Sequence, residues 1–195
     1  MNLQLFRKPS VWIALALFVG VAVGAPVTYH KLLRWKKFRV VEQDILYRSG
    51  SLRPWQLRKA IDRYDIKTVY SLTHTRHLEE QEVCDEKGVK RYFCYLPGDG
   101  VGSDDPYLRF LEVIEDPRNH PVLVHCSAGV QRTGGAVALY RILFNGWEAD
   151  AAIEEMIDLG NKGRQTQIEQ IKRIAERLRT SRLVHQDDSP ERETY

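Results

Sequence analysis

The 195-residue sequence predicts an α/β domain in which a mostly parallel central sheet is flanked by helices, preceded by an N-terminal transmembrane helix. The domain is predicted because short apolar runs, typical of buried strands, alternate with longer helix-like stretches over residues 40–182. One of these runs, 121–124, leads through a glycine-containing loop into a helix-like stretch. The transmembrane helix is predicted because residues 11–27 are almost entirely apolar.

We expect residues 1–30 to form an uncleaved membrane anchor. A helix over the apolar run would be about 25 Å long, and its flanking residues extend it to the roughly 30 Å of a bilayer's hydrocarbon core. Trp12 and Tyr29 fall where interfacial aromatic residues are common. A cleaved signal peptide and a buried helix of the domain are the alternatives, and Pro26 argues against cleavage after Ala25.

Residues 31–39 form a basic juxtamembrane segment, whereas only Arg7 and Lys8 precede the apolar run. This asymmetry predicts a single-pass membrane protein whose following domain lies in the cytoplasm. Apolar side chains interleave with the cations, so the segment either lies on anionic lipid or is a charged flank without a lipid role. The net charge of +3 is too small to indicate a nucleic-acid partner.

Within the domain at 40–182, each element follows from its pattern and its end signals. We expect strands at about 39–41, 45–47, 67–72, 91–96 and 122–125, and helices at about 54–64, 78–87, 107–115, 135–144, 148–159 and 166–179. Pro54 suits a first helical turn, while Gly88, Pro117 and Gly146 end helices. Residues 183–195 are polar and are expected to form a disordered tail.

The ten residues His125–Gly134 carry the strongest chemical signal. Successive backbone N–H groups in a tight loop, followed by a helix N-terminus, form an anion site. Gly129 allows backbone angles that other residues resist, and Arg132 has a planar fork that can bind two phosphate oxygens. Cys126 would lie in this positive field, which lowers the pKa of a thiol and makes it nucleophilic. The expected phosphate-binding residues are Ser127, Ala128, Gly129, Val130, Gln131 and Arg132.

The pattern His-Cys-x5-Arg-Thr at 125–133 resembles the phosphate-binding loop of the cysteine-dependent protein tyrosine phosphatase superfamily. Residues 45–52, Ile-Leu-Tyr-Arg-Ser-Gly-Ser-Leu, are similar to the opening of its compact dual-specificity members. The resemblance implies that Cys126 attacks phosphorus to form a phosphocysteine, and that Arg132 and the loop amides stabilise the transferred group. It implies that His125 and Thr133 support the cysteine, and that neither a metal nor a cofactor is needed.

The resemblance also implies a general acid, an aspartate on a mobile loop about thirty residues before the cysteine. Asp99, which lies 27 positions before Cys126 and between two glycines, is the expected acid. The loop lacks the tryptophan of the family's acid loop. Asp104 and Asp105 are the alternatives, although both also fit as helix-capping residues.

Two glutamine signals are weaker. Residues 165–170, Gln-Thr-Gln-Ile-Glu-Gln, are similar to the loop with which some tyrosine phosphatases position the attacking water, but the spacing differs by one residue. We favour the simpler interpretation, the start of an amphipathic helix. Gln131 departs from the glycine common in tyrosine-specific members, and it could contact the substrate or the attacking water.

The predicted function is therefore hydrolysis of phosphotyrosine, and also of phosphoserine or phosphothreonine, in proteins. A phosphoinositide or other lipid phosphatase is the alternative, since the basic segment could lie on a membrane. The uncharged side chains inside the cysteine loop argue against it, because related lipid phosphatases often carry lysines there. A non-catalytic phospho-binding module is the third reading, opposed by the presence of Cys126, Arg132 and Asp99 together.

The remaining cysteines and histidines give weaker functional signals. Three cysteines do not form a disulfide framework, and a nucleophilic thiol favours a reducing compartment. Cys84 and Cys94 are expected in the core, with reversible disulfide formation to Cys126 as the alternative. His74 and His77 are three residues apart but lack a matched third ligand, so we expect surface histidines rather than a metal site.

Overall fold

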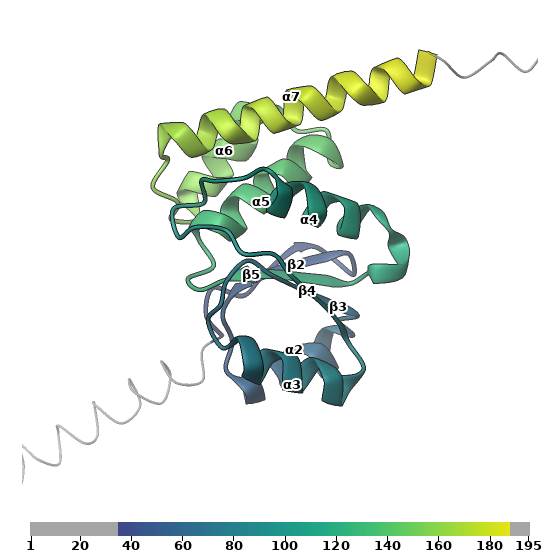
Figure 1. Cartoon of the computed structure of the whole chain (residues 1–195), viewed down its shortest axis with the longest axis vertical. Coiled ribbons are helices and arrows are strands. Elements are labelled where there is room, and N and C mark those ends of the chain that lie inside the picture. Colours follow the sequence, from purple (N-terminus) through teal and green to yellow (C-terminus); the bar gives the residue numbers. More distant parts are fainter. Residues whose placement is uncertain (1–34, 188–195) are drawn as a thin grey trace, which may run out of the picture. The chain divides into compact units, whose positions relative to one another are not determined.

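The computed structural model describes residues 35–187. A five-stranded sheet lies between two layers of helices (Figure 1). In spatial order the strands are β1 (Arg39–Glu42), β2 (Leu46–Gly50), β5 (Val122–Cys126), β3 (Thr68–Ser71) and β4 (Lys90–Phe93). β1 pairs antiparallel with β2, and the other neighbours pair in parallel. The sheet is thus mixed but mostly parallel, as the sequence predicted.

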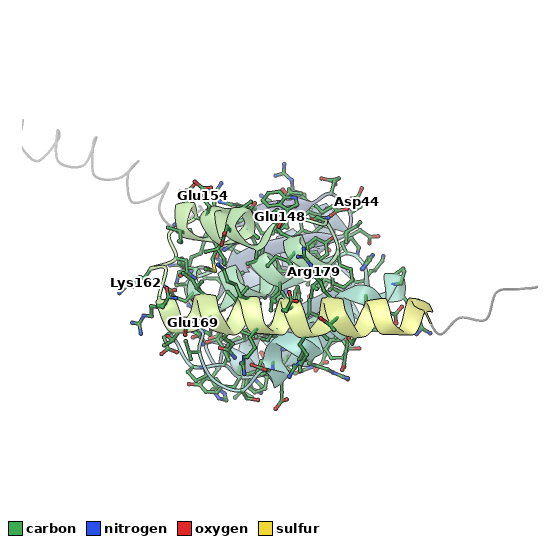
Figure 2. The ribbon with its side chains drawn as sticks, turned by 90° about the horizontal axis from the view of Figure 1, so that it is seen from above. Asp44, Glu148, Glu154, Lys162, Glu169 and Arg179 are labelled. Atoms are coloured by element: carbon green, nitrogen blue, oxygen red, sulfur yellow. The ribbon has the colours of Figure 1, made fainter. Side chains whose placement is uncertain are left out.

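Helices cover both faces of the sheet (Figure 1). On one face lie α2 (Pro54–Tyr64) and α3 (His77–Lys87); on the other lie α4 (Asp105–Glu115), α5 (Gln131–Leu143) and α6 (Ala149–Asp158), with α7 (Gln165–Asp187) across them. A short 3-10 helix, Pro117–Asn119, follows α4. In the view of Figure 2, α7 crosses this outer layer, and Arg179 donates to the carbonyl oxygens of Ile142 and Trp147 at 3.2 and 2.9 Å. α7 thereby ties down the turn between α5 and α6.

Local signals account for most helix boundaries. Pro54 occupies the first turn of α2, where its missing N–H costs nothing. Gly88 ends α3 in the left-handed conformation, with φ of 64°. Gly146, with φ of 69°, lies in the turn that follows α5, and the cap of α5 is Phe144 in the right-handed conformation. The boundaries at Pro54 and Gly88 lie where the sequence predicted them, because each depends on only a few neighbouring residues.

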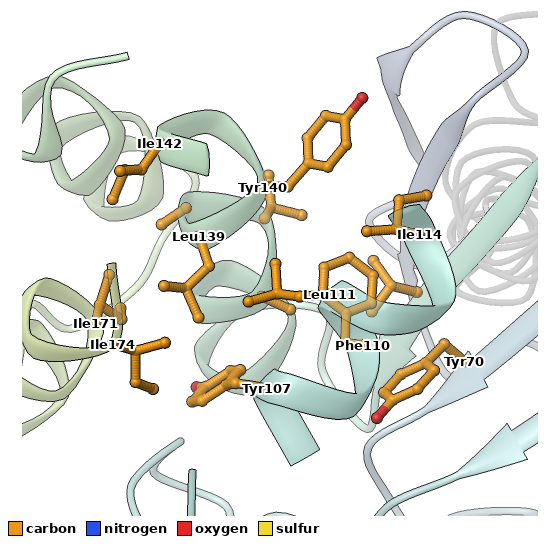
Figure 3. Packing of buried hydrophobic residues seen from close by; sticks show 14 of the residues in the cluster. Tyr70, Tyr107, Phe110, Leu111, Ile114, Leu139, Tyr140, Ile142, Ile171 and Ile174 are labelled. Carbon is orange, nitrogen blue, oxygen red and sulfur yellow. The ribbon is translucent and has the colours of Figure 1, made fainter. Parts of the chain in front are cut away.

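The core has two parts, one on each face of the sheet. The larger part joins the sheet to α4, α5, α6 and α7, and in Figure 3 Tyr107, Ile171 and Ile174 lie around Leu139 of α5. The smaller part joins the opposite face to α2 and α3, and it contains Leu123 of β5. β5 is therefore buried on both faces, which fixes the position of the loop that follows it.

The compact unit begins at Trp35, before the predicted domain boundary at residue 40. Phe38 lies edge-on to Trp35 at a ring-centroid distance of 4.9 Å and stacks on Tyr64 of α2, also at 4.9 Å. Tyr47 of β2 completes this aromatic cluster, 4.9 Å from Tyr64. The described end of the predicted juxtamembrane segment 31–39 is thus part of the domain.

The predicted transmembrane helix and single-pass membrane location require correction. Between residues 35 and 187, no helix is both long enough and apolar enough to cross a bilayer. α7 is the longest helix there, and charged residues recur along its whole length. The segment 1–30, on which the prediction rested, lies outside the described residues.

Two other boundaries differ from expectation. β4 ends at Phe93, and the chain then turns to bring the carbonyl oxygen of Leu96 to Arg132. α7 continues to Asp187, so the first residues of the predicted tail 183–195 are helical, and 188–195 lie outside the described residues.

Candidate active site

The cysteine loop lies at the carboxyl edge of the sheet, where the parallel strands end together. Gly50 of β2 pairs with Cys126 of β5, and Ser71 of β3 pairs with His125. The chain turns through residues 127–130, and α5 begins at Gln131 with its N-terminus facing the loop. Ligands of parallel α/β sheets bind at this edge.

Gly129 allows the loop to close against the neighbouring strand. Its φ is 72°, which favours glycine. A Cβ at this position would lie only 2.5 Å from the backbone nitrogen of Gly50 and 2.6 Å from the carbonyl carbon of Ser49. The loop therefore packs against the end of β2 in a way that only glycine permits.

The sulfur of Cys126 is buried at the base of the loop and accepts a hydrogen bond from the N–H of Gly129 at 3.3 Å. Burial opposes the thiolate, but the hydroxyl and amide of Thr133, the charge of Arg132 and the amide of Val130 outweigh burial and lower the pKa of Cys126 to about 7. The Thr133 hydroxyl bonds no oxygen or nitrogen in the described chain, so it is available to the sulfur. The thiolate is thus more populated at neutral pH than in an ordinary cysteine.

Arg132 is held by two carbonyl oxygens from different strand ends. One terminal nitrogen, Nη1, donates to Leu72 at 3.0 Å and to Leu96 at 3.2 Å. The Nε–H is buried and has no hydrogen-bond partner within residues 35–187. A buried donor without a partner is costly, and an oxygen of a bound phosphate would satisfy this one.

Arg48 is a second buried cation at the loop, and the sequence assigned it no role. It lies on β2, and its Nη2 donates to the carbonyl oxygen of Gly129 at 3.1 Å. Burial lowers its pKa to about 10, so the side chain remains charged at neutral pH. By bonding this carbonyl, Arg48 orients the Gly129–Val130 peptide, and the N–H of Val130 in the same peptide helps to lower the pKa of Cys126.

His125 points to the opposite side of the sheet from Cys126, because side chains alternate along a strand. Its Nε2 lies 2.6 Å from a carboxylate oxygen of Glu80 on α3. Glu80 in turn bonds Arg91 of β4. Sequence reasoning missed both Glu80 and Arg91, because nothing in their local pattern shows that they are buried.

Asp99 lies on the loop between β4 and α4. Its Oδ1 accepts from the N–H of Val101 at 3.1 Å, and its Oδ2 lies 3.6 Å from the Arg164 guanidinium. Asp99 and Cys126 both act electrostatically on the buried hydroxyl of Tyr107, whose pKa is raised chiefly by burial. The structure therefore brings Asp99 to the same region as the sulfur.

The two alternative acids are engaged elsewhere. Asp104 accepts from Gln170 at 2.9 Å and from Arg173 at 2.8 Å. Asp105 accepts from the hydroxyl of Ser103 at 2.6 Å. Asp104 thus joins the start of α4 to α7, whereas Asp105 bonds within the turn that precedes α4.

The glutamines at the start of α7 connect the cysteine loop to the acid loop, which is the Asp99-bearing loop between β4 and α4. Gln167 donates through Nε2 to the carbonyl oxygen of Gln131 at 3.0 Å and to the hydroxyl of Tyr107 at 3.1 Å. Its Oε1 accepts from Asn161 at 3.1 Å. Gln170 donates to the carbonyl oxygen of Gly102 at 2.8 Å. Both glutamines lie in a helix, as expected, but they hold the two loops together, and the amide of Gln167 is fully engaged.

The weaker signals form no metal site or disulfide. No group of three potential metal-ligating side chains occurs within residues 35–187. His77 bonds Arg91 at 2.9 Å, and the ring of His74 lies 4.6 Å from that of Tyr95. Cys84 and Cys94 are free thiols, and burial raises the pKa of Cys84 to about 12, which makes it unreactive.

Comparison with known proteins links this geometry to a family. A family model described as "Tyrosine phosphatase family" matches residues 32–190. The tyrosine-protein phosphatase-like protein OCA2 of Saccharomyces cerevisiae is 31% identical over 120 residues, which cover 60% of this chain and 61% of that protein. The inositol diphosphatase DSP3 of Arabidopsis thaliana is 30% identical over 123 residues, which cover 60% of this chain and 59% of that protein. The chain thus spans less than two thirds of the length of these relatives.

A solved structure is similar over most of the described chain. The crystal structure of TpbA from P. aeruginosa matches with a TM-score of 0.59 and 27% identity, over 74% of this chain and 89% of that one.

Proposed function

Since the chain belongs to the tyrosine phosphatase family, we propose that it is a cysteine-dependent phosphatase that hydrolyses phosphotyrosine in proteins through a phosphocysteine intermediate. The observation that carries the proposal is the buried sulfur of Cys126 at the base of a loop that also leads to Arg132, whose buried Nε–H has no partner within residues 35–187. The same surface would accept phosphoserine and phosphothreonine where the pocket is shallow enough for their shorter side chains.

The first step transfers the phosphoryl group to sulfur. The Cys126 thiolate attacks phosphorus, an S–P bond forms and the P–O bond to the leaving group breaks. Asp99 gives its proton to the departing oxygen. Arg132, the loop amides and the N-terminus of α5 stabilise the charge on the phosphoryl oxygens. Ser127, Ala128, Gly129, Val130 and Gln131 supply the backbone of this site.

The second step releases phosphate. A water molecule attacks phosphorus and loses a proton to the Asp99 carboxylate as the S–P bond breaks, so the thiolate and the protonated acid are both regenerated. His125 and Thr133 support the sulfur in both steps. In this scheme the side chains of Cys126, Asp99 and Arg132, together with the loop amides, perform both steps.

Hydrolysis of inositol phosphates or phosphoinositides is the second candidate function. One specific observation favours it: a relative of 30% identity is named an inositol diphosphatase. Cations also border the loop. Lys37 places its amine 3.6 Å from the position that a Cβ at Gly160 would occupy. Arg164 and Lys162 lie between α6 and α7, and Lys162 is labelled in Figure 2. These cations could bind additional phosphates of a polyphosphorylated ring.

Against that, the side chains inside the cysteine loop carry no charge at Ser127, Ala128, Val130 and Gln131. A phosphate next to the reacting one would find no cation there. This favours a substrate with a single phosphate, such as phosphotyrosine.

A side-by-side turnover assay of the full chain tests the proposal. Phosphotyrosine peptide, phosphothreonine peptide, an inositol pyrophosphate and a phosphoinositide are each offered, with Cys126→Ser as the inactive control. We expect kcat/KM to be highest for the phosphotyrosine peptide. A preference of tenfold or more for either inositol compound would instead establish the second candidate. Phosphopeptide binding without phosphate release by the wild-type chain would indicate a binding module.

A further inference from the structure

A buried row of ionisable groups lies behind the cysteine on the α3 side of the sheet. Arg91 of β4 donates through Nε to Glu80 Oε1 at 2.7 Å, and Glu80 Oε2 lies 2.6 Å from His125 Nε2. The side chains of these three residues are only 3–6% exposed. His125 directly precedes Cys126 in β5. In sequence order the members are far apart, so only the fold brings them together.

When all four groups are ionised, positive and negative charges alternate along the row. The guanidinium of Arg91 is followed by the carboxylate of Glu80, the imidazolium of His125 and the thiolate of Cys126. Each charge then has an opposite neighbour, which is the condition under which buried charges are tolerated. Without a charged Glu80, an imidazolium at His125 would be buried without a partner, and burial alone would favour the neutral ring.

The groups around His125 support the charged form. Burial lowers the pKa of His125, but the carboxylate of Glu80 and the neighbouring Cys126 outweigh it, and the pKa is raised overall. Burial raises the pKa of Glu80, but His125 and Arg91 outweigh burial and lower the pKa overall, so the carboxylate stays ionised. Cys84, one turn along α3, faces Glu80 as a neutral thiol. His77 and Gln81 bond Arg91 at 2.9 and 3.2 Å and hold its guanidinium in place.

Linkage makes the effect reciprocal. If the Cys126 thiolate favours the imidazolium of His125, the imidazolium favours the thiolate by the same free energy. A group that stabilises the imidazolium from behind must therefore also increase the thiolate fraction. Glu80 is the only residue shown to pair with His125 in the described part of the chain.

We propose that Glu80, held by Arg91, is a positioning residue that keeps His125 protonated and thereby keeps Cys126 ionised. The proposal rests on the proposed function only in naming Cys126 as the nucleophile. Neither Glu80 nor Arg91 contacts the substrate in this scheme, and both act through His125.

The test measures the thiolate directly, without substrate. Full-length Glu80→Gln is compared with wild type and with Glu79→Gln, which removes an exposed carboxylate paired with Arg76 on the same helix. Inactivation by iodoacetamide is followed from pH 5 to 10, and mass spectrometry identifies the alkylated cysteine. We expect Glu80→Gln to raise the midpoint for Cys126 by about one pH unit, which slows alkylation about tenfold at pH 6. Rates should converge above pH 9.5, and Glu79→Gln should match wild type.

A double variant separates positioning from a general structural effect. With His125→Asn already present, Glu80→Gln should shift the Cys126 midpoint no further, since the intermediary is gone. An additional shift of similar size in the double variant would overturn the proposal. So would an unchanged midpoint in a folded Glu80→Gln.

A measurement on the wild-type chain remains decisive if Glu80→Gln fails to fold. The imidazole NMR signals of His125 are titrated, and we expect a pKa above the ordinary value of about 6.5. A pKa below that value would overturn the proposal. Because alkylation and NMR need no turnover, a failure here is distinguishable from the absence of phosphatase activity.

Discussion

The side-chain amide of Gln167 on α7 donates to the hydroxyl of Tyr107 on α4 at 3.1 Å. Tyr107 passes this connection on, because its own hydroxyl donates to the carbonyl oxygen of Gly100 in the acid loop at 2.9 Å. The same amide bonds the carbonyl oxygen of Gln131, where α5 begins. One glutamine therefore sets the spacing between the loop that carries Asp99 and the loop that carries Cys126.

Replacing Gln167 with leucine should weaken both stability and turnover. The change leaves the carbonyl of Gln131 and the amide of Asn161 without this partner, which costs about 1–3 kcal/mol. Urea unfolding measures this loss. Loosening the acid loop should also lower kcat by roughly tenfold or more. Gln165→Leu, at an exposed position in the first turn of the same helix, is the control. Equal stability of the two variants would show that the Gln167 bonds contribute nothing.

Asp99→Asn should impair poor leaving groups selectively. General acid catalysis contributes about 10²–10⁴-fold, so turnover of phosphotyrosine peptide should fall by that factor. An aryl phosphate whose phenol is strongly acidic needs no proton and should lose far less. The measurement is kcat against leaving-group pKa for both enzymes. Asp105→Asn, which disrupts only the contact with Ser103, serves as control.

If Asp99→Asn turns over the phosphotyrosine peptide within a few-fold of wild type, Asp99 is not the acid. A loss confined to Asp105→Asn would transfer the role to that residue. Both variants and the wild type are assayed at one and the same pH, because general acid catalysis depends on pH.

The sequence predicted those features that depend on neighbouring residues. α2 occupies Pro54–Tyr64 as expected, because its period and its proline are local. The strand, loop and helix around Cys126 could also be predicted, because the apolar run 121–124, Gly129 and Arg132 lie within twenty residues of one another. β5 could be predicted as a strand because it is buried on both faces and is therefore a continuous apolar run in the sequence.

The parts that could not be predicted depend on contacts between distant segments. α3 contains several carboxylates, and only Glu80 among them faces Arg91 and His125. Nothing local distinguishes it from Glu79. Arg48 similarly gains its role from Gly129, which is 81 residues away. The membrane prediction failed for a different reason, because it rested on hydropathy alone, and within residues 35–187 no helix is long and apolar enough to cross a bilayer.

The hydroxyl of Thr133 should contribute measurably to the ionisation of Cys126. In the folded chain the pKa of the thiol is lowered to about 7, so the thiolate fraction, and with it the alkylation rate, should fall tenfold per unit below that pH. Thr133→Ala removes a stabilising donor and should move the midpoint upward, toward the ordinary value of about 8.5. Iodoacetamide inactivation measured from pH 5 to 10 gives both midpoints. Thr166→Ala, at an exposed site on α7, should leave the midpoint unchanged.

The sign of this shift also fixes a trend in stability. An acid whose pKa is lower in the folded chain stabilises the fold above its unfolded pKa, and this contribution disappears as the pH falls through about 7. The free energy of unfolding of wild type minus that of Cys126→Ser should therefore rise between pH 6 and pH 9. A difference that is flat over this range would contradict a lowered pKa.

Gly129→Ala should abolish phosphate binding. Comparison with Gly146→Ala separates the cost of the positive φ from the collision of the added Cβ. Alanine at a positive φ costs about 1–2 kcal/mol, and this cost applies equally at Gly146, where φ is 69° and a Cβ meets no atom within 4 Å. At Gly129 the Cβ would in addition collide with backbone atoms of Ser49 and Gly50, which cannot move without displacing β2. We expect Gly146→Ala to lose only that stability and to bind vanadate, a phosphate mimic, normally. Gly129→Ala should lose vanadate binding and alkylate more slowly at neutral pH, because its N–H no longer reaches the sulfur. Normal vanadate affinity in Gly129→Ala would show that β2 yields, and that the close packing of loop and strand is not required for the phosphate site.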